Sequence, residues 1–220
     1  MIYKIKLFLF KTIQKFFSIF NIKIFYSKDL DCFQTINLDC IIDVGVAKGT
    51  RFLNNRFPNT FYYLIEANDN YYHYLEKVFL KKYKGKLFKI GAGKEKNKKY
   101  FYKSGVTSSF LERENFNPST KIQLQIDTLN NILKNEIISE NTLLKIDCEG
   151  GELDVLIGAN DILKKIKYLI IEIRLQKINT YNPSELVNYI FEKGFYWKHI
   201  IKVYYAKKGI DFIDVLFVKK

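Results

Sequence analysis

The sequence predicts an α/β fold built on an open, mostly parallel sheet that finishes in an antiparallel β-hairpin. Short apolar runs typical of buried strands alternate with helix-forming segments along most of the chain. Several of these runs end in an acid or a glycine turn, where parallel sheets bind ligands. Near the carboxyl end, two apolar runs at 200–205 and 210–218 flank a Lys-Lys-Gly turn, which indicates the hairpin.

Composition restricts the classes of protein. The chain has 220 residues, 48% apolar and 27% charged, as expected for a globular domain with a substantial core. Its net charge of +13 favours the binding of anions. The Lys residues are spread along the chain and form no dense Lys/Arg block of the kind that recognises bases, so no specific nucleic-acid partner is expected. Cys32, Cys40 and Cys148 lack Cys-x-x-Cys spacing, and His73 and His199 stand alone, which favours a reduced, cytoplasmic setting without a zinc site.

Residues 1–35 form a basic, apolar extension before a domain at 36–220. Its apolar runs are too short and too interrupted by Lys to cross a bilayer, and no small-residue cleavage site of the secretory kind follows them. We expect a helix packed on the domain, because Lys on a helix usually marks a solvated face. The alternative is an amphipathic helix within 1–26 resting on the inner face of the membrane.

In the first half of the chain we expect four strands, at 41–44, 61–65, 86–90 and 122–126, and an extra strand at 100–102. A helix at 51–57 should end before Pro58, which disfavours helix in the residue ahead of it. A second helix, capped by Asn68 or Asp69, has apolar residues at helical spacing and lysines at its carboxyl end. Its inward positions are Tyr71, Tyr74, Leu75, Val78 and Phe79. A solvated turn at 94–99 and a short helix at 129–134 complete this half.

The second half repeats the alternation. A strand at 143–146 leads into a helix whose Leu153, Leu156 and Ile157 should face inward, and a strand at 168–171 ends in Glu172. Asn182 caps the next helix, with Pro183 at its first position and Glu185 at its third, and Gly194 ends it.

Two segments carry chemistry. In the first, an apolar strand runs into a turn with Gly45 and Gly49, and about twenty residues later the next strand ends in Glu66, the spacing of a βαβ unit that binds a nucleoside cofactor. A merely structural turn is the alternative. Gly91-Ala92 offers small residues where an adenine ring lies flat against backbone, or a plain turn.

In the second segment, the strand at 143–146 ends in Asp147 and Glu149, followed by two glycines. Neither carboxylate is at a position that helix-dipole or surface arguments require, so both are candidates for chemistry. Glu152, in the first helical turn, has the default role of complementing the helix dipole. Lys145 lies within the strand and is the weakest candidate.

On these motifs the sequence resembles the FkbM family of S-adenosylmethionine-dependent methyltransferases. The resemblance covers about residues 41–172, and its most specific string is Leu144-Lys145-Ile146-Asp147-Cys148-Glu149-Gly150-Gly151-Glu152-Leu153. It departs from the family at Val46-Ala47, where Ala-Asn is usual, and at Ala67, where Pro is usual. The resemblance implies a Rossmann-like class I methyltransferase sandwich and O-methylation of a hydroxyl, often on a sugar, glycan or secondary metabolite.

The resemblance implies that the turn from Gly45 to Gly49 lies near the methionine part of the cofactor and that Glu66 binds its ribose hydroxyls. The expected cofactor-binding set is Asp43, Gly45, Gly49, Thr50, Glu66, Asn68, Gly91 and Ala92. Asp147 or Glu149 is the candidate for the base that removes the hydroxyl proton or for a group that orients the substrate. No metal is expected, although Asp147, Glu149 and Glu172 would hold a divalent cation if they met. A loop at 105–118 would shape the acceptor pocket. The alternative to an enzyme is a non-catalytic module with the same fold that binds a membrane surface or nucleic acid.

Overall fold

The computed structural model describes residues 32–103, 108–110, 121–175, 181–206 and 209–219. The chain divides into two compact units, Met1–Ile36 and Asn37–Lys220. Residues 1–31 of the extension expected at 1–35, its membrane contact through 1–26 and most of the loop at 105–118 lie outside the described residues. Where the chain is described, no helix is long and apolar enough to cross a membrane. All strands of the described residues belong to the second unit.

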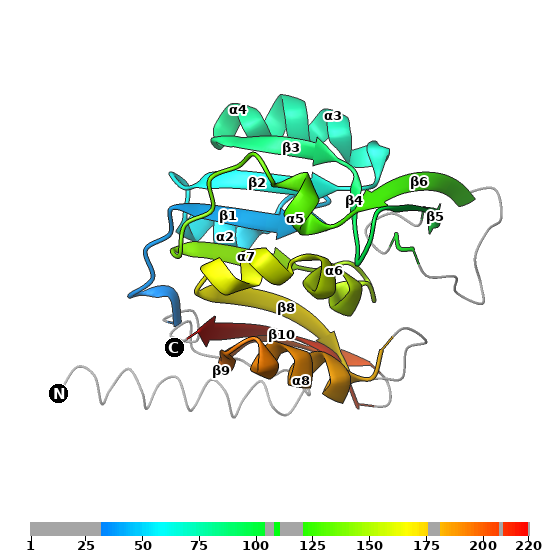
Figure 1. Cartoon of the computed structure of the whole chain (residues 1–220). Coiled ribbons are helices and arrows are strands. Elements are labelled where there is room, and N and C mark those ends of the chain that lie inside the picture. Colours follow the sequence, from blue (N-terminus) through cyan, green and yellow to red (C-terminus); the bar gives the residue numbers. More distant parts are fainter. Residues whose placement is uncertain (1–31, 104–107, 111–120, 176–180, 207–208, 220) are drawn as a thin grey trace, which may run out of the picture. The chain divides into compact units, whose positions relative to one another are not determined.

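The second unit is built on a seven-stranded sheet in the order β3-β2-β1-β7-β8-β10-β9 (Figure 1). Its strands are β1 (Cys40–Val44), β2 (Phe61–Glu66), β3 (Gly85–Lys89), β7 (Thr142–Ile146), β8 (Tyr168–Arg174), β9 (Phe195–Ala206) and β10 (Gly209–Lys219). The first five in spatial order are parallel, and β10 and β9 join β8 as an antiparallel hairpin. The predicted α/β fold with its carboxyl-terminal hairpin is confirmed.

The strand order reverses beside β1. The chain moves outward from β1 to β2 and β3, then returns to β7 on the other side of β1 and continues to β8. Open α/β sheets bind ligands at such a reversal, beyond the carboxyl ends of the strands. A small sheet, β4-β6-β5, lies at that end of the strands (Figure 1). It comprises β4 (Gly91–Ala92), β5 (Asn97–Tyr102) and β6 (Lys121–Asp127).

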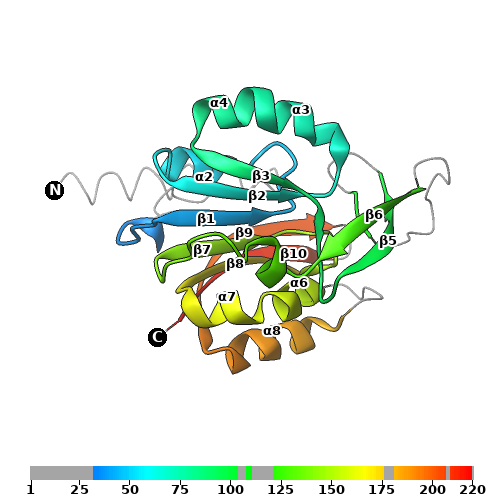
Figure 2. The ribbon, with the colours of Figure 1, turned by 45° about the horizontal axis from the view of Figure 1, so that its top comes forward.

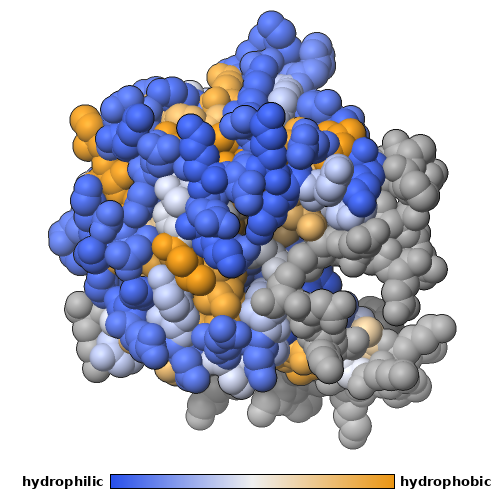
Figure 3. Space-filling model, turned by 45° about the vertical axis from the view of Figure 1, so that its right-hand side comes forward, coloured by the Kyte–Doolittle hydropathy of each residue, from blue (hydrophilic) through white to orange (hydrophobic). Residues whose placement is uncertain are grey.

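Helices cover both faces of the large sheet (Figure 2). One face packs on α5 (Leu129–Ile132), α6 (Glu152–Gly158), α7 (Asn160–Lys165) and α8 (Pro183–Glu192) in a continuous core. On the other face, α2 (Arg51–Arg56) and the helical segment 69–82 meet over β2, where the Tyr62 hydroxyl donates to the Leu53 and Phe57 carbonyls. The face drawn in Figure 3 is mainly hydrophilic, with small hydrophobic groups, in orange, between the hydrophilic side chains.

The helix expected after Glu66 changes between 3₁₀, α and π geometry along its length. It comprises η2 (Asp69–Tyr71), α3 (Tyr72–Tyr74), a π-helical stretch η3 (Leu75–Phe79) and α4 (Leu80–Lys82), and Asn68 caps it by accepting from the Asn70 N–H at 3.1 Å. The prediction that Val78 faces inward is wrong, since 51% of it is exposed. Val78 lies within the π-helical stretch, where a turn holds more residues than an α turn, so the α-helical spacing behind the prediction does not apply to it.

Other boundaries also differ from the prediction. Strand β8 continues to Arg174, so Glu172 lies inside it, because β10 pairs with it as far as Arg174. Ile157 is 40% exposed and does not face the core. The reason is that Gly158 abuts the small sheet, where an added Cβ would lie 2.0 Å from the Gly93 carbonyl oxygen. Strand β5 begins at Asn97, within the expected turn at 94–99, because it pairs with β6.

Candidate active site

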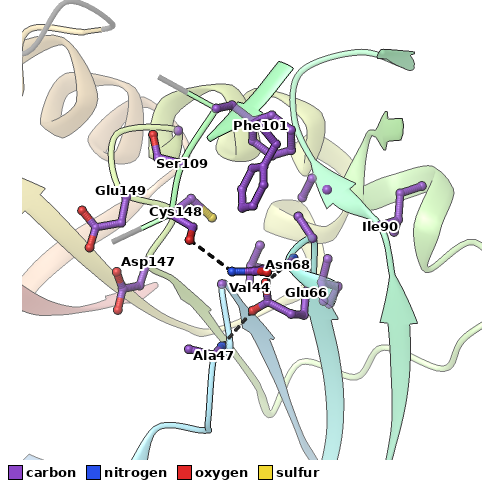
Figure 4. A pocket seen from close by; sticks show the side chains of 18 of the residues that line it. Val44, Ala47, Glu66, Asn68, Ile90, Phe101, Ser109, Asp147, Cys148 and Glu149 are labelled. Atoms are coloured by element: carbon purple, nitrogen blue, oxygen red, sulfur yellow. Dashed lines mark hydrogen bonds between the residues drawn. The ribbon is translucent and has the colours of Figure 1, made fainter. Parts of the chain in front are cut away.

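A pocket opens at the carboxyl ends of β1, β2 and β7 (Figure 4). Gly45 and Ala47 from the turn after β1, Glu66 and Asn68 after β2, and Asp147 after β7 all line it. Segments about a hundred residues apart in sequence therefore meet at one place, as carboxyl ends of parallel strands do. Gly91, Ala92, Cys148 and Glu149 belong to the same lining.

The turn after β1 depends on the missing side chain of Gly45. Its φ is +77°, in the left-handed region, and an added Cβ would lie only 1.9 Å from the carbonyl oxygen of Asp147. The Gly45 N–H donates to the Ile65 carbonyl at 3.0 Å, and the Asp147 N–H donates to the Val44 carbonyl at 3.1 Å. The ends of three strands are thus held together by backbone alone, and only glycine fits at their centre.

Glu66 is held by backbone donors. It is 6% exposed, and its Oε2 accepts from the Ala47 N–H at 2.8 Å while its Oε1 accepts from the Asn68 N–H at 2.7 Å. Burial raises the pKa of Glu66, and these two hydrogen bonds oppose the rise. A carboxylate has about four acceptor positions, so each oxygen keeps one for a ligand hydroxyl. The Asn68 amide donates to Ser108 Oγ at 3.1 Å.

Asp43, Gly49 and Thr50 do not line the pocket. Asp43 is fully buried, and its Oδ2 accepts from the Thr50 hydroxyl at 2.9 Å. A Cβ at Gly49 would lie 2.7 Å from the Phe79 ring and 2.8 Å from the Asn54 amide, so this glycine allows the turn to pack on two helices. The structure places these three residues beneath the turn as its support.

Aromatic side chains form the wall of the pocket near Gly91. Phe101 and Phe110 line it with ring centroids 4.9 Å apart, and a Cβ at Gly91 would lie 2.6 Å from Phe110. The space left between the lining side chains is about 70 Å³. Ligand pockets usually measure roughly 300 Å³ or more. A nucleoside cofactor therefore needs more room than this arrangement of side chains leaves.

Lys145 lies between two carboxylates. It is 7% exposed, and its Nζ is 3.3 Å from Asp43 Oδ1 and 3.2 Å from Asp147 Oδ2. Burial acts to lower the pKa of Lys145, but the charges of Asp147 and Asp43 outweigh it and raise the pKa. For Asp43, burial outweighs the attraction of Lys145, and its pKa is raised. We regard the three groups as charged, because one ammonium contacts two carboxylates at ion-pair distance.

Glu149 is paired with an arginine. Its φ is +54°, and the Arg174 guanidinium bonds its Oε2 and lies 3.2 Å from Glu172 Oε1. Burial first, and then the Asp147 charge, raise the pKa of Glu172 to about 9 against the opposing effect of Arg174. Among the described residues, no group of three or more His, Cys, Asp or Glu is arranged to hold a metal ion. Arg174 already supplies a cation between Glu149 and Glu172.

Three important residues escaped the sequence analysis or were undervalued in it. Glu152 is fully buried, and its Oε1 accepts from the N–H groups of Cys148 and Gly150, both at 3.0 Å, while its Oε2 accepts from the Tyr181 hydroxyl at 2.8 Å. Its role is to shape the loop after β7 in addition to any effect on the helix dipole. Lys145 and Arg174 hold Asp147 and Glu149. An isolated basic residue inside an apolar strand was the available signal for both.

Comparison with known proteins identifies the class. Residues 43–196, more than half of the chain, match the family described as the methyltransferase FkbM domain. No curated protein matches the sequence. The magnesium protoporphyrin IX methyltransferase of Synechocystis PCC 6803, solved with bound S-adenosylmethionine, has a similar fold, with a TM-score of 0.50 and 6% identity over 87% of this chain and 74% of that one.

An FkbM methyltransferase from Methylobacillus flagellatus KT aligns with a TM-score of 0.49 and 16% identity, covering 81% of this chain. The present chain spans only 43% of that protein's length. TrmK from M. capricolum, solved with S-adenosylhomocysteine, aligns with a TM-score of 0.48 and 14% identity over 89% of this chain and 69% of that one.

The fold is Rossmann-like, and the matched family is one of methyltransferases, a class whose methyl donor is S-adenosylmethionine. Within that class, the chain belongs to the FkbM methyltransferase family.

Proposed function

We propose that the protein transfers a methyl group from S-adenosylmethionine to a hydroxyl oxygen, with a sugar, glycan or secondary metabolite as acceptor. One observation carries the proposal: the glycine turn at Gly45, the Glu66 carboxylate and the Asp147 carboxylate line the same pocket. The first two suit a nucleoside cofactor, and the third lies where an acceptor would approach it.

The chemistry of the pocket fits the cofactor. Glu66 keeps an acceptor position on each oxygen for ribose hydroxyls. Gly45 allows backbone to approach a ligand where a side chain would clash. Gly91 and Ala92 lie in the aromatic part of the lining, where an adenine ring would fit once the side chains leave more room. Asp43, Gly49 and Thr50 would act through the turn that they support.

The bound cofactor supplies an activated methyl group, so the protein's task is to place the acceptor and take up its proton. We assign the base to Asp147, which lines the pocket and whose side chain is 36% exposed, while Lys145 holds its Oδ2. A positioned carboxylate of this kind contributes rate by accepting the proton as the new bond forms. Glu149 is bonded to Arg174, which supports a positioning role for it.

The test is transfer of labelled methyl from S-adenosylmethionine into extracted glycans and small polyhydroxyl compounds. We expect Asp147→Asn to lower kcat by about 10²–10⁴-fold, because the amide cannot accept the proton. Calorimetry should show that this variant keeps its affinity for the cofactor. An unchanged kcat would refute the assignment of the base. Cofactor binding without transfer to any hydroxyl would leave a non-catalytic module, for which binding to liposomes or RNA is the next measurement.

A further inference from the structure

A second hollow lies apart from the pocket at the strand ends. A groove of about 300 Å³ opens between α2 and the helical segment 69–82, and Lys48, Arg51 and Lys82 line it. The lining contains no carboxylate and shares no residue with the pocket at the strand ends. Lys48 follows Ala47, which lines that pocket, so adjacent residues of one turn face two separate hollows.

The three cations of the groove have no acidic partner among the residues that the structure describes. Within the described part of the chain, Lys48, Arg51 and Lys82 form no ion pair, although lysines elsewhere pair with acids, as Lys86 does with Glu136 at 2.6 Å. The Lys48 ammonium lies 6.0 Å from the ring centre of Tyr74, which also lines the groove. Like charges gathered around a hollow create a positive potential that attracts an anion.

Asn54 provides an independent indication of a ligand. This residue lines the groove and is 5% exposed, yet its side-chain Oδ1 is buried without a hydrogen-bond partner among the described residues. Buried polar atoms in native proteins are almost always paired, and leaving one unpaired costs free energy. Because this oxygen is buried, a ligand hydroxyl or amine would complete the missing hydrogen bond only when the amide turns toward the groove.

We propose that this groove binds a small phosphate ester that carries a neighbouring hydroxyl or amine, such as a sugar phosphate or a nucleotide. Lys48, Arg51 and Lys82 contact the phosphate, Asn54 Oδ1 accepts from the donor group, and the Tyr74 ring packs on the body of the ligand. The size of the groove falls at the lower end of the range for small-molecule sites. This site goes beyond the proposed methyl transfer and does not depend on it.

The test is calorimetric titration of the intact chain with inorganic phosphate, glucose 6-phosphate and AMP at fixed ionic strength. Comparison of the two esters distinguishes a sugar phosphate from a nucleotide. We expect at least one ester to bind tighter than phosphate itself, and Arg51→Gln with Lys82→Gln to weaken it by about tenfold or more, since charge-assisted hydrogen bonds are lost. The matched control is Lys81→Gln with Lys84→Gln, which removes the same charge from exposed residues outside the groove lining and should change the affinity by less than about threefold.

Asn54→Leu tests the second contact. It removes the amide oxygen and keeps a side chain of similar size, so it should weaken binding of the phosphate ester beyond the loss seen in the control pair, because the hydrogen bond to the ligand is lost. Thermal unfolding of each variant checks that the fold is kept. Equal weakening of ester binding in both pairs of variants would overturn the proposal. So would the failure of all three probes to bind, or a parallel titration in which only single-stranded RNA binds. Cofactor affinity, measured separately, reports on the other pocket.

Discussion

The two sides of the strand-end pocket hold their carboxylates differently. On the β1–β2 side, Glu66 is fixed by two backbone N–H groups, from Ala47 and Asn68. On the β7–β8 side, Asp147 and Glu149 are fixed by side-chain cations, Lys145 and Arg174. Backbone donors belong to the fold and carry no ionisable proton, whereas each ion pair depends on two charges that were taken out of water.

This difference suggests a division of labour. The proposed cofactor side is preorganised by the chain path itself, so its geometry should vary little with pH or salt. The proposed acceptor side collects Asp147, Glu172 and Asp214. Burial first, and then the Asp147 charge, raise the pKa of the other two carboxyls, that of Asp214 to about 6. Stability and activity should therefore be more sensitive to charge on the β7–β8 side.

The largest expected effect is on the backbone-held side. Gly45→Val places a side chain against the Asp147 carbonyl oxygen, which leaves no room for it. It also puts a β-branched residue at a positive φ, which such residues rarely adopt. We expect loss of measurable cofactor binding and destabilisation by about 4 kcal/mol or more, measured by calorimetry and urea unfolding. Gly209→Ala is the control, since its φ is also positive, at +134°, but nothing lies within 4 Å of an added Cβ. Equal losses in both variants would mean that backbone strain and not the close approach is the cause.

The next effect is on the charge-held side. Lys145→Met removes the ammonium between Asp43 and Asp147 and leaves a buried carboxylate without its cation. Breaking a buried pair in this way typically costs about 3–5 kcal/mol, which urea unfolding would detect. Adding Asp43→Asn should restore part of the loss, because the double variant no longer buries that charge. A double variant no more stable than Lys145→Met would argue against the ion pair as the origin of the effect.

The smallest effect concerns pH. The pKa of Glu172 is about 9 in the folded protein against an ordinary value of 4.5, so between these values the folded state keeps a proton that the unfolded state has lost. The free energy of unfolding should then fall as pH rises, by at most about 1.4 kcal/mol per pH unit for one proton. Glu172→Gln should flatten this slope between pH 6.5 and 8.5 in urea unfolding. An identical slope in both proteins would show that Glu172 is ionised throughout.

Local patterns in the sequence were enough to predict most elements. The apolar run at 61–65 identified β2 to within one residue, and the Asn182-Pro183 start of α8 follows from capping chemistry that acts over a few residues. Predictions failed where a distant partner changes the outcome. The antiparallel neighbour β10 extends β8 through Glu172, and the approach of Gly93 to Gly158 turns Ile157 outward.

By itself, the sequence determined the alternating α/β fold, the family, and the three strand ends that carry Gly45, Glu66 and Asp147, because strand, turn and cap signals are short-range and repeat along the chain. Only the tertiary structure decided what each carboxylate contacts. Lys145 joins Asp43 to Asp147 across neighbouring strands, and Arg174 reaches Glu149 from β8. These pairs depend on the register between neighbouring strands and on the burial of the side chains. Neither can be inferred from the spacing of residues along the sequence.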